Sequence, residues 1–547
     1  MHSVTISLVL LLAVVAAGFI ARMLPLKMPL PLVQIAVGAG LSYGFGLRVP
    51  LDPEFFFLFF IPPLLFLDGW RIPKSAFFRD VRPIMTLAIG LVLFTVLGVG
   101  YFIHWMIPSV PLAAALALAA ILSPTDPVAV SAIASQSPIP SRLMHILEGE
   151  SLLNDASGLV CFRFAVAAVI TGTFSLVDAS LNFLMAAGGG LLVGIAVAWL
   201  VGILNRWLVT VAGEDPGGQI LISLLVPFAA YLAADHMSVS GILAAAAAGI
   251  TTHYADMFGR RLASTRMQRI AVWDTIQMAL NGVIFVILGA QLRTTIEGLP
   301  AVAAELGMSH PAWLLLYVVA ITAVLAVLRF LWVWSSLKFT LFRKRRDQEE
   351  ATKPSLRLLL MTAFAGVRGA VTLAGILTLP LLMPDGSLFP KRDLLIFLAK
   401  GVILLSLLSA SIALPLLTRN LKFVPQPIVG KEEGWARAAA AEAALRHLGR
   451  IAQPGEKRGY DANPEAIARV TELYRRRLDY GTSDGDEAMR ARTVAEAERN
   501  LRLEAIHAER EELFQLWLHS KLDDGLHRRL LRELDLTEGA LSRDSEH

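Results

Sequence analysis

Long apolar stretches recur along this chain, and they limit most strongly what it can fold into. A helix of about 20 apolar residues crosses a hydrocarbon core of about 30 Å. Only 17% of the residues are charged, against about 25% in a typical soluble domain, which excludes an ordinary cytosolic enzyme. We therefore expect an all-α polytopic membrane protein with about 13 transmembrane helices. The expected spans lie near residues 3–22, 29–47, 54–70, 84–106, 111–135, 146–171, 183–211, 218–235, 239–254, 272–292, 311–340, 356–382 and 393–418.

The basic residues of the connecting loops indicate the orientation of the spans, because cytoplasmic loops collect Lys and Arg. Alternate loops are rich in basic residues and the loops between them are poor in them. With an odd number of spans, this pattern places the N-terminus outside a plasma (inner) membrane and the C-terminal tail in the cytoplasm. The rich loops hold Arg22, Lys27, Arg71, Lys74, Arg79, Arg82, Arg142, Arg260, Arg261, Arg266, Arg269 and residues 343–346, whereas the others hold Arg48, Arg293, Lys391 and Arg392.

The composition changes after the last span, and this change predicts two domains. Residues 1–420 form the transmembrane domain, and residues 421–547 form a charged, Ala/Glu/Arg-rich tail with helical periodicity. Helices are expected at 435–449, 464–478 and 486–518, and Leu513, Trp517 and Leu518 give the last of them an apolar stripe. The tail is interpreted as a solvated helical segment, with regulation or dimerisation as the alternative.

Several functional classes lack their sequence motifs here. The chain has one cysteine, Cys161, inside an apolar stretch, so a disulfide framework and a cysteine zinc site are not expected. It contains no Gly-rich phosphate loop, no GxSxG elbow and no HExxH motif. We therefore predict that the protein is not an enzyme and uses no cofactor, that it does not bind nucleic acid, and that it is not an ATP-driven pump.

The fifth span contains the sequence Ser123-Pro124-Thr125-Asp126-Pro127 within an Ala/Leu/Val-rich stretch. Proline has no N–H group, so the carbonyls of Ala120 and Ser123 lose their helical donors and become free to act as ligands. The helix is therefore expected to be unwound at this point. Asp126 is interpreted as a functional carboxylate, because a charge at this depth is costly. A helix N-cap is its structural alternative and is compatible with ion binding by a broken helix.

The sixth span opens with Glu148-Gly149-Glu150-Ser151-Leu152-Leu153-Asn154-Asp155. At 100° per residue, Ser151 and Asp155 share one face with Glu148, whereas Glu150 points about 140° away from Asp155. Asp155 is thus expected to face a cavity together with Asp126. Glu150 needs a cation on another helix, for which Arg329 and Arg368 are the candidates, and a structural ion pair is the favoured interpretation.

Two further segments carry charge within apolar spans. Arg368 stands between Gly366 and Gly369 in the twelfth span, which indicates close helix approach or an irregular segment. The fifth and twelfth spans are seven apart, as they would be in two inverted six-helix repeats joined by one linking helix. In the third span, Asp68 follows a Pro-Pro pair and is either a funnel acid or an interfacial residue paired with Arg71.

Three of these motifs together resemble the monovalent cation/proton antiporters, specifically the bacterial form of the sodium/proton exchanger branch. The resemblance covers about residues 1–420 and implies crossed, broken helices 5 and 12 in a six-helix core. It further implies a separate dimerisation domain and a homodimer that works by an elevator-like motion. The motifs are Thr125-Asp126-Pro127-Val128, Glu150 to Asp155, and Gly366-Val367-Arg368-Gly369-Ala370.

The resemblance also implies roles for individual residues. Asp155 would carry either the ion or the proton, while Asp126 and the Thr125 carbonyl would line the crossing, with Ser151 and Asn154 close by. Glu150 would form a salt bridge with Arg329, and Arg368 would support the broken helix. Electrogenic relatives have a second Asp at the position of Asn154, so electroneutral exchange is implied. Many relatives also have an acid where this chain has Leu67, one position before Asp68.

The predicted function is secondary active exchange of Na⁺ (or Li⁺) for H⁺, with the lipid bilayer as solvent and a Na⁺ site as the only metal site. A K⁺/H⁺ antiporter is the nearest alternative, because oxygen ligand types do not distinguish these cations. A cation channel and a membrane sensor with a transporter-like core are the alternatives from other classes. The channel would carry ohmic current, and the sensor would carry no flux.

Overall fold

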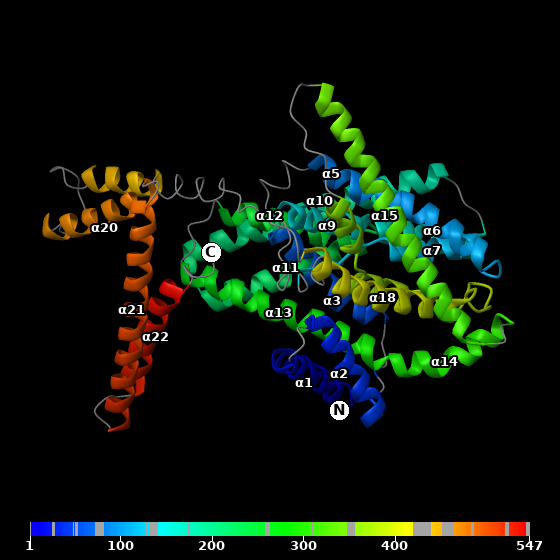
Figure 1. Ribbon diagram of the computed structural model, residues 1–547, viewed down its shortest axis with the longest axis horizontal. Coiled ribbons are helices and arrows are strands. Elements are labelled where there is room, and N and C mark those ends of the chain that lie inside the picture. Colours follow the sequence, from blue (N-terminus) through cyan, green and yellow to red (C-terminus); the bar gives the residue numbers. More distant parts are fainter. Residues whose placement is uncertain are drawn as a thin grey trace. The chain divides into compact units, whose positions relative to one another are not determined.

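The computed structural model describes most of the chain as helix (Figure 1). Pro127 and Val128 of the expected break, several basic loop residues and the start of the tail lie outside the described residues. The described residues are 2–24, 28–47, 49, 53–71, 81–126, 130–131, 141–172, 176–213, 215–257, 263–307, 310–346, 356–418, 439–450, 464–482, 486–519 and 524–542.

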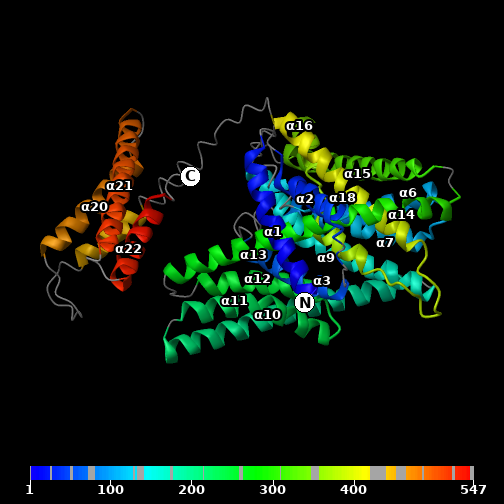
Figure 2. The ribbon, with the colours of Figure 1, turned by 90° about the horizontal axis from the view of Figure 1, so that it is seen from below.

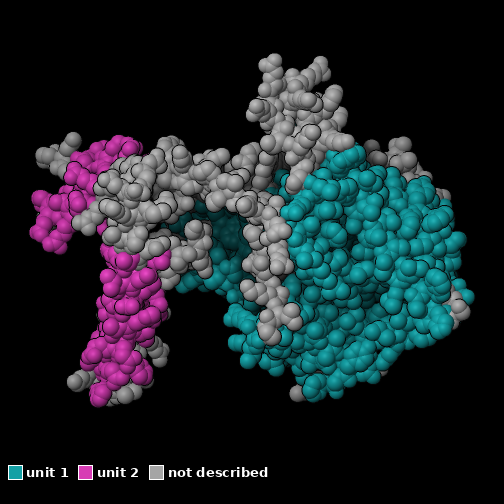
Figure 3. Space-filling view, in the orientation of Figure 1, with its two compact units in different colours: residues 1–421 teal, residues 422–547 magenta. Residues whose placement is uncertain are grey.

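The chain divides into two compact units, Met1–Leu421 and Lys422–His547 (Figure 3). Within the described part of the first unit, eight helices are long and apolar enough to cross a membrane, and two shorter ones are apolar. The described residues of this unit contain no strand, only an isolated bridge between Leu382 and Leu388. The prediction of an all-helical membrane fold is confirmed, whereas the count of 13 spans stays a prediction.

The helices of the first unit lie where the apolar stretches predict them. One was not predicted: α14 follows the tenth expected span and is amphipathic. The helices are α1 (His2–Met23), α2 (Leu30–Phe45), α3 (Pro53–Arg71), α5 (Val81–Met85), the π-helix η1 (Thr86–Leu91), α6 (Val92–Met106), α7 (Leu112–Leu122), α9 (Ser141–Thr171), α10 (Leu176–Ala212), α11 (Pro216–His236), α12 (Gly241–Met257), α13 (Ala263–Ala290), α14 (Leu292–Glu305), α15 (Ala312–Arg346), α16 (Leu356–Phe364), α17 (Ala370–Leu377) and α18 (Arg392–Thr418).

These helices pack as two groups. The first, here the glycine-packed group, consists of α1, α2, α3 and α10 to α13, of which α10 to α13 lie side by side in Figure 2. The second, here the broken-helix group, consists of η1, α6, α7, α9 and α15 to α18. The helices α3 and α13 of the first group contact α17 of the second, and α3 and α12 contact α9. These contacts form a seam between the groups.

Glycines bring the backbones of the first group into direct contact. A Cβ atom at Gly38 of α2 would collide with the backbone of α13, and one at Gly289 of α13 would collide with α2. Gly69 of α3 and Gly249 of α12 make the same reciprocal approach. Small residues drive helix association in membranes because they allow such close packing. The contacts also fix the rotation of α3 and α13 about their own axes.

Two helices of the second group are interrupted at the seam. The chain leaves α7 after Leu122 and is helical again at residues 130–131, and it leaves α16 after Phe364 and re-enters helix at Ala370. The two breaks meet, because the Asp126 N–H donates to the Val367 carbonyl over 2.7 Å. The first break occurs where the proline motif predicts it, and the second is the irregular segment that is one of the two interpretations of the Gly366 to Gly369 sequence.

The second unit is helical in its described residues. Residues 439–450 form one helix, followed by α20 (Pro464–Thr482), α21 (Asp486–Leu518) and α22 (Asp524–Ser542). The last of these lies beyond the expected helices. Arg510 of α21 joins it to α22 by pairing with Asp535 at 2.7 Å and with Glu538.

Candidate functional site

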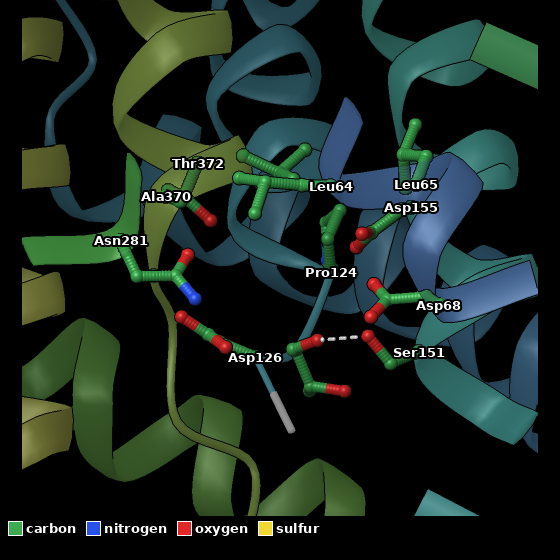
Figure 4. Close-up of a pocket in the computed structure, with 13 residues that line it drawn as sticks. Leu64, Leu65, Asp68, Pro124, Asp126, Ser151, Asp155, Asn281, Ala370 and Thr372 are labelled. Atoms are coloured by element: carbon green, nitrogen blue, oxygen red, sulfur yellow. Dashed lines mark hydrogen bonds between the residues drawn. The ribbon is translucent and has the colours of Figure 1, made fainter. Parts of the chain in front are cut away.

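A small pocket lies at the seam, where the broken segments face α3, α9 and α13 (Figure 4). Its volume is about 30 Å³, which is enough to hold a water molecule. Both helix groups contribute to its walls. Its polar lining residues are Asp68, Thr125, Asp126, Ser151, Asp155, Asn281 and Thr372.

Asp126 and Asp155 both line the pocket, and Asp155 is only 5% exposed. Asp126 stands in the break after α7, and Asp155 lies on α9, as the helical spacing of the sixth span predicts. With Asp68, three carboxylates line this small site, and buried carboxylates are costly unless a proton or a cation compensates them. Carboxylate and carbonyl oxygens are also the ligands that hard cations prefer. The arrangement can therefore bind protons and a dehydrated cation in the same place.

Hydrogen bonds from α9 hold the unwound segment in place. The Ser151 hydroxyl donates to the Thr125 carbonyl over 2.7 Å (Figure 4), and the Asn154 amide donates to the Thr125 hydroxyl over 2.9 Å. Gly158 of α9 lies against Pro124 so closely that a Cβ atom would not fit. Ser151 and Asn154, which the sequence placed close to Asp126, thus both bind Thr125. The Thr125 carbonyl keeps a second lone pair for a ligand.

Arg368 joins the two broken helices. Its Nε donates to the Leu122 carbonyl at the end of α7 over 2.8 Å, and its Nη1 donates to the Gly366 carbonyl. Its backbone N–H donates to the Ser406 hydroxyl of α18 over 3.2 Å. A buried guanidinium here satisfies carbonyls that the breaks deprive of helical donors. Gly369, the next residue, is needed because a Cβ atom there would collide with the Asp126 carboxylate.

Glu150 forms a buried ion pair with Arg329 of α15. The two bonds measure 2.5 and 2.7 Å, and the side chains are 0% and 3% exposed. Arg329 also donates through Nε to the Thr362 carbonyl over 2.8 Å. Of the two candidate cations, Arg329 is thus the one hydrogen-bonded to Glu150, while Arg368 serves the broken helices. Glu150 does not line the pocket.

Asp68 lines the pocket from α3, whereas Leu67 is buried against Phe66 and Trp273 in a separate apolar cluster. Arg71 pairs with Asp274 of α13 and donates to Gln277 over 2.5 Å. The rotation of α3 therefore directs the acid at position 68, and not the residue at position 67, toward the site.

Two polar wall residues, Asn281 and Thr372, are absent from the residues that the sequence predicts for the site. Asn281 of α13 lines the pocket, and its carboxamide points toward the Asp126 carboxylate (Figure 4). The signal for Asn281 in the sequence is an uncharged amide in the middle of an apolar span, with no charge or helix-breaking motif beside it. Thr372, two residues after the Gly366 to Ala370 motif, lines the same pocket.

Comparison with known proteins identifies the family. The family model described as "Sodium/hydrogen exchanger, transmembrane" matches residues 8–419. The chain belongs to this sodium/hydrogen exchanger family. The exchanger is 41% identical over 548 residues to the uncharacterized Na⁺/H⁺ exchanger YjcE of Escherichia coli strain K12, a match that covers 98% of this chain and 99% of the relative.

Two other similarities bear on this exchanger. A sodium, potassium, lithium and rubidium/H⁺ antiporter of Bacillus pumilus is 44% identical over 417 residues, which are 76% of this chain and 61% of that protein. The structure of the sodium proton antiporter MjNhaP1 from Methanocaldococcus jannaschii superposes with a TM-score of 0.57 at 18% identity, covering 77% of this chain and 99% of that one. The fold is therefore that of a known antiporter.

Membership of this family confirms the predicted sodium/proton exchanger resemblance. The family is one of multi-pass membrane transporters that exchange monovalent cations for protons, and not one of enzymes.

Proposed function

We propose that this exchanger moves Na⁺ or Li⁺ in one direction and H⁺ in the other, with Asp155 as the shared carrier of both. The observation that supports this most is that Asp155 and Asp126 line the same small pocket, at the place where two helix breaks meet. The break after α7 supplies the Thr125 carbonyl at the same place. No ATP-binding motif occurs in the sequence, so the gradient of one ion drives the movement of the other.

Competition for one carboxylate is sufficient for exchange. Asp155 binds either a proton or a cation, and alternating access then carries whichever is bound. The pocket is small and lined by carboxylate, hydroxyl and carbonyl oxygens, so in this proposal the cation binds there without its full hydration shell. Oxygens of Asp126, Thr125 and Ser151 replace the lost water, with Asn154 holding Thr125 in position.

The charge balance favours electroneutral exchange. Asn154 is uncharged and is engaged with Thr125, so it does not bind a second proton. Glu150 and Arg329 neutralise each other away from the pocket. With Asp155 as the single carrier, one proton is exchanged for one monovalent cation.

The packing supports a motion of one helix group against the other. The reciprocal glycine contact between α2 and α13 has a counterpart between α3 and α12, as two inverted six-helix repeats would give. In this proposal the glycine-packed group is the dimerisation subdomain of a homodimer, and the broken-helix group carries the ion past it. The protein lies in the plasma (inner) membrane with its N-terminus outside and residues 421–547 in the cytoplasm.

K⁺/H⁺ exchange is the second candidate. It is favoured by the Bacillus pumilus relative, whose name includes potassium and rubidium besides sodium and lithium. The oxygen ligands of the pocket are compatible with each of these cations.

The test is dissipation of a pH gradient in proteoliposomes on addition of Na⁺, Li⁺ or K⁺. Wild type is expected to respond to Na⁺ and Li⁺ without net current, and Asp155→Asn is expected not to respond. Asp235→Asn, which removes an acid of α11 outside the pocket, is the matched control and should retain flux. A response to K⁺ alone would select the second candidate. Normal flux in Asp155→Asn, or ohmic current in wild type, would refute the proposal.

A further inference from the structure

Building on the proposed function, we infer that Asn281 and Thr372 form the opposite wall of the cation site and set its affinity for the cation. Asn281 belongs to α13 of the glycine-packed group, and Thr372 belongs to α17 of the broken-helix group. Both line the pocket that Asp126 and Asp155 share.

The orientation of Asn281 is the first observation. Its carboxamide points at the Asp126 carboxylate (Figure 4). Its position is set by close packing, because a Cβ atom at the adjacent Gly282 would collide with Val14 and the Gln34 amide. An amide carries both donors and an acceptor. It can therefore donate to Asp126 when no cation is bound, and offer its oxygen when one is.

The hydroxyl of Thr372 is the second, independent observation. The residue is 1% exposed, and its Oγ1 has no hydrogen-bond partner among the residues that the structure describes. A buried hydroxyl without a partner is costly, and most such groups in proteins are satisfied. A cation in the pocket would satisfy it, since the oxygen has lone pairs to offer.

The two residues complete a shell of oxygens. Asp126, Asp155, Thr125 and Ser151 supply oxygens from the broken segment and α9, and Asn281 and Thr372 face them from α13 and α17. A hard cation that gives up its hydration water needs oxygen ligands on all sides, so one wall alone would leave its shell open. Because Asn281 stands on the other helix group, the shell is complete only in one register of the two groups. Sliding of the groups would then remove the Asn281 ligand and weaken cation binding before release.

The test uses the full-length protein in proteoliposomes with Na⁺ as the probe. Asn281→Ala and Thr372→Val are expected to raise the apparent KM for Na⁺, each by about tenfold, which corresponds to about 1.4 kcal/mol. The maximal rate should stay within about twofold, because Asp155 is intact. Thr372→Val keeps the shape of the side chain. Asn281→Ser should bind Na⁺ more tightly than Asn281→Ala, because its hydroxyl returns an oxygen to the site.

Two matched controls remove similar groups elsewhere. Asn205→Ala removes a buried amide of α10, and Thr322→Val removes a hydroxyl of α15; neither residue lines the pocket. Both should leave KM unchanged. The protection of each purified variant by Na⁺ against thermal unfolding gives the same affinity without transport.

The outcomes separate this inference from the proposed function. Unchanged KM and unchanged Na⁺ protection in Asn281→Ala and Thr372→Val, with flux still lost in Asp155→Asn, would overturn the second wall and leave the exchanger proposal intact. A fall in maximal rate with no change in KM would assign both residues to folding and would also overturn it. Absence of cation-dependent flux in wild type would refute both.

Discussion

Removal of one partner of the Glu150–Arg329 pair should destabilise the protein strongly, whereas removal of both should not. The side chains are 0% and 3% exposed and form two bonds of 2.5 and 2.7 Å, so both charges are fully desolvated. A buried charge that loses its partner typically costs about 3–5 kcal/mol, and we expect this cost for Arg329→Met. Replacing the whole pair with apolar side chains of similar size is often neutral or stabilising.

The assay is a double-mutant cycle on reversible unfolding in mixed micelles, with wild type, Arg329→Met, Glu150→Met and the double variant. The double variant is expected to be more stable than Arg329→Met by about 2 kcal/mol or more, because both variants lack the bond from Arg329 to the Thr362 carbonyl and only the single variant leaves the Glu150 carboxylate unpaired. It should also retain cation-dependent flux, because Glu150 lies outside the pocket. Additive destabilisation in the double variant would refute the claim that the pair is coupled, and lost flux in a stable double variant would give Glu150 a direct role in transport.

Two further predictions follow from single contacts. Gly369→Ala should abolish or greatly reduce flux in folded protein, because the new methyl group collides with the Asp126 carboxylate. The control is Gly40→Ala, whose methyl group meets no atom within 4 Å. This variant should transport normally in the same proteoliposome assay. In the tail, the hydrogen bond from Arg510 holds the pKa of Glu538 below its ordinary value of 4.5, so this contact stabilises α22 fully above about pH 4.5 and is lost as the pH falls further. Amide exchange of α22 in the full chain, corrected for intrinsic rates, should therefore rise on acidification, and an unchanged profile in Glu538→Gln would show that another group is responsible.

Helix positions and breaks were predictable because they depend on local properties. The apolar length of each span and the missing N–H of Pro124 act within a few residues. The helix α14 was missed because it is short and amphipathic, and therefore lacks the signal of a span.

The partners of the charged residues depended on tertiary packing. The spacing on α9 predicted that Glu150 and Asp155 face different neighbours. It did not distinguish Arg329 from Arg368 as the cation that pairs with Glu150, because that choice depends on how α15 packs against α9. The direction of Asp68 depended on the rotation of α3, which the Gly69 contact with α12 sets. Such contacts join residues far apart in the sequence, and a single sequence does not contain their geometry.

The most direct test of the central claim is proton release on cation binding. Purified protein in weakly buffered detergent solution would be titrated with NaCl against choline chloride, while a pH indicator reports released protons. Competition at Asp155 predicts release that saturates with Na⁺ at about one proton per protomer, and no release from Asp155→Asn. Saturable Na⁺ binding without proton release in wild type, or undiminished release from the variant, would contradict the account.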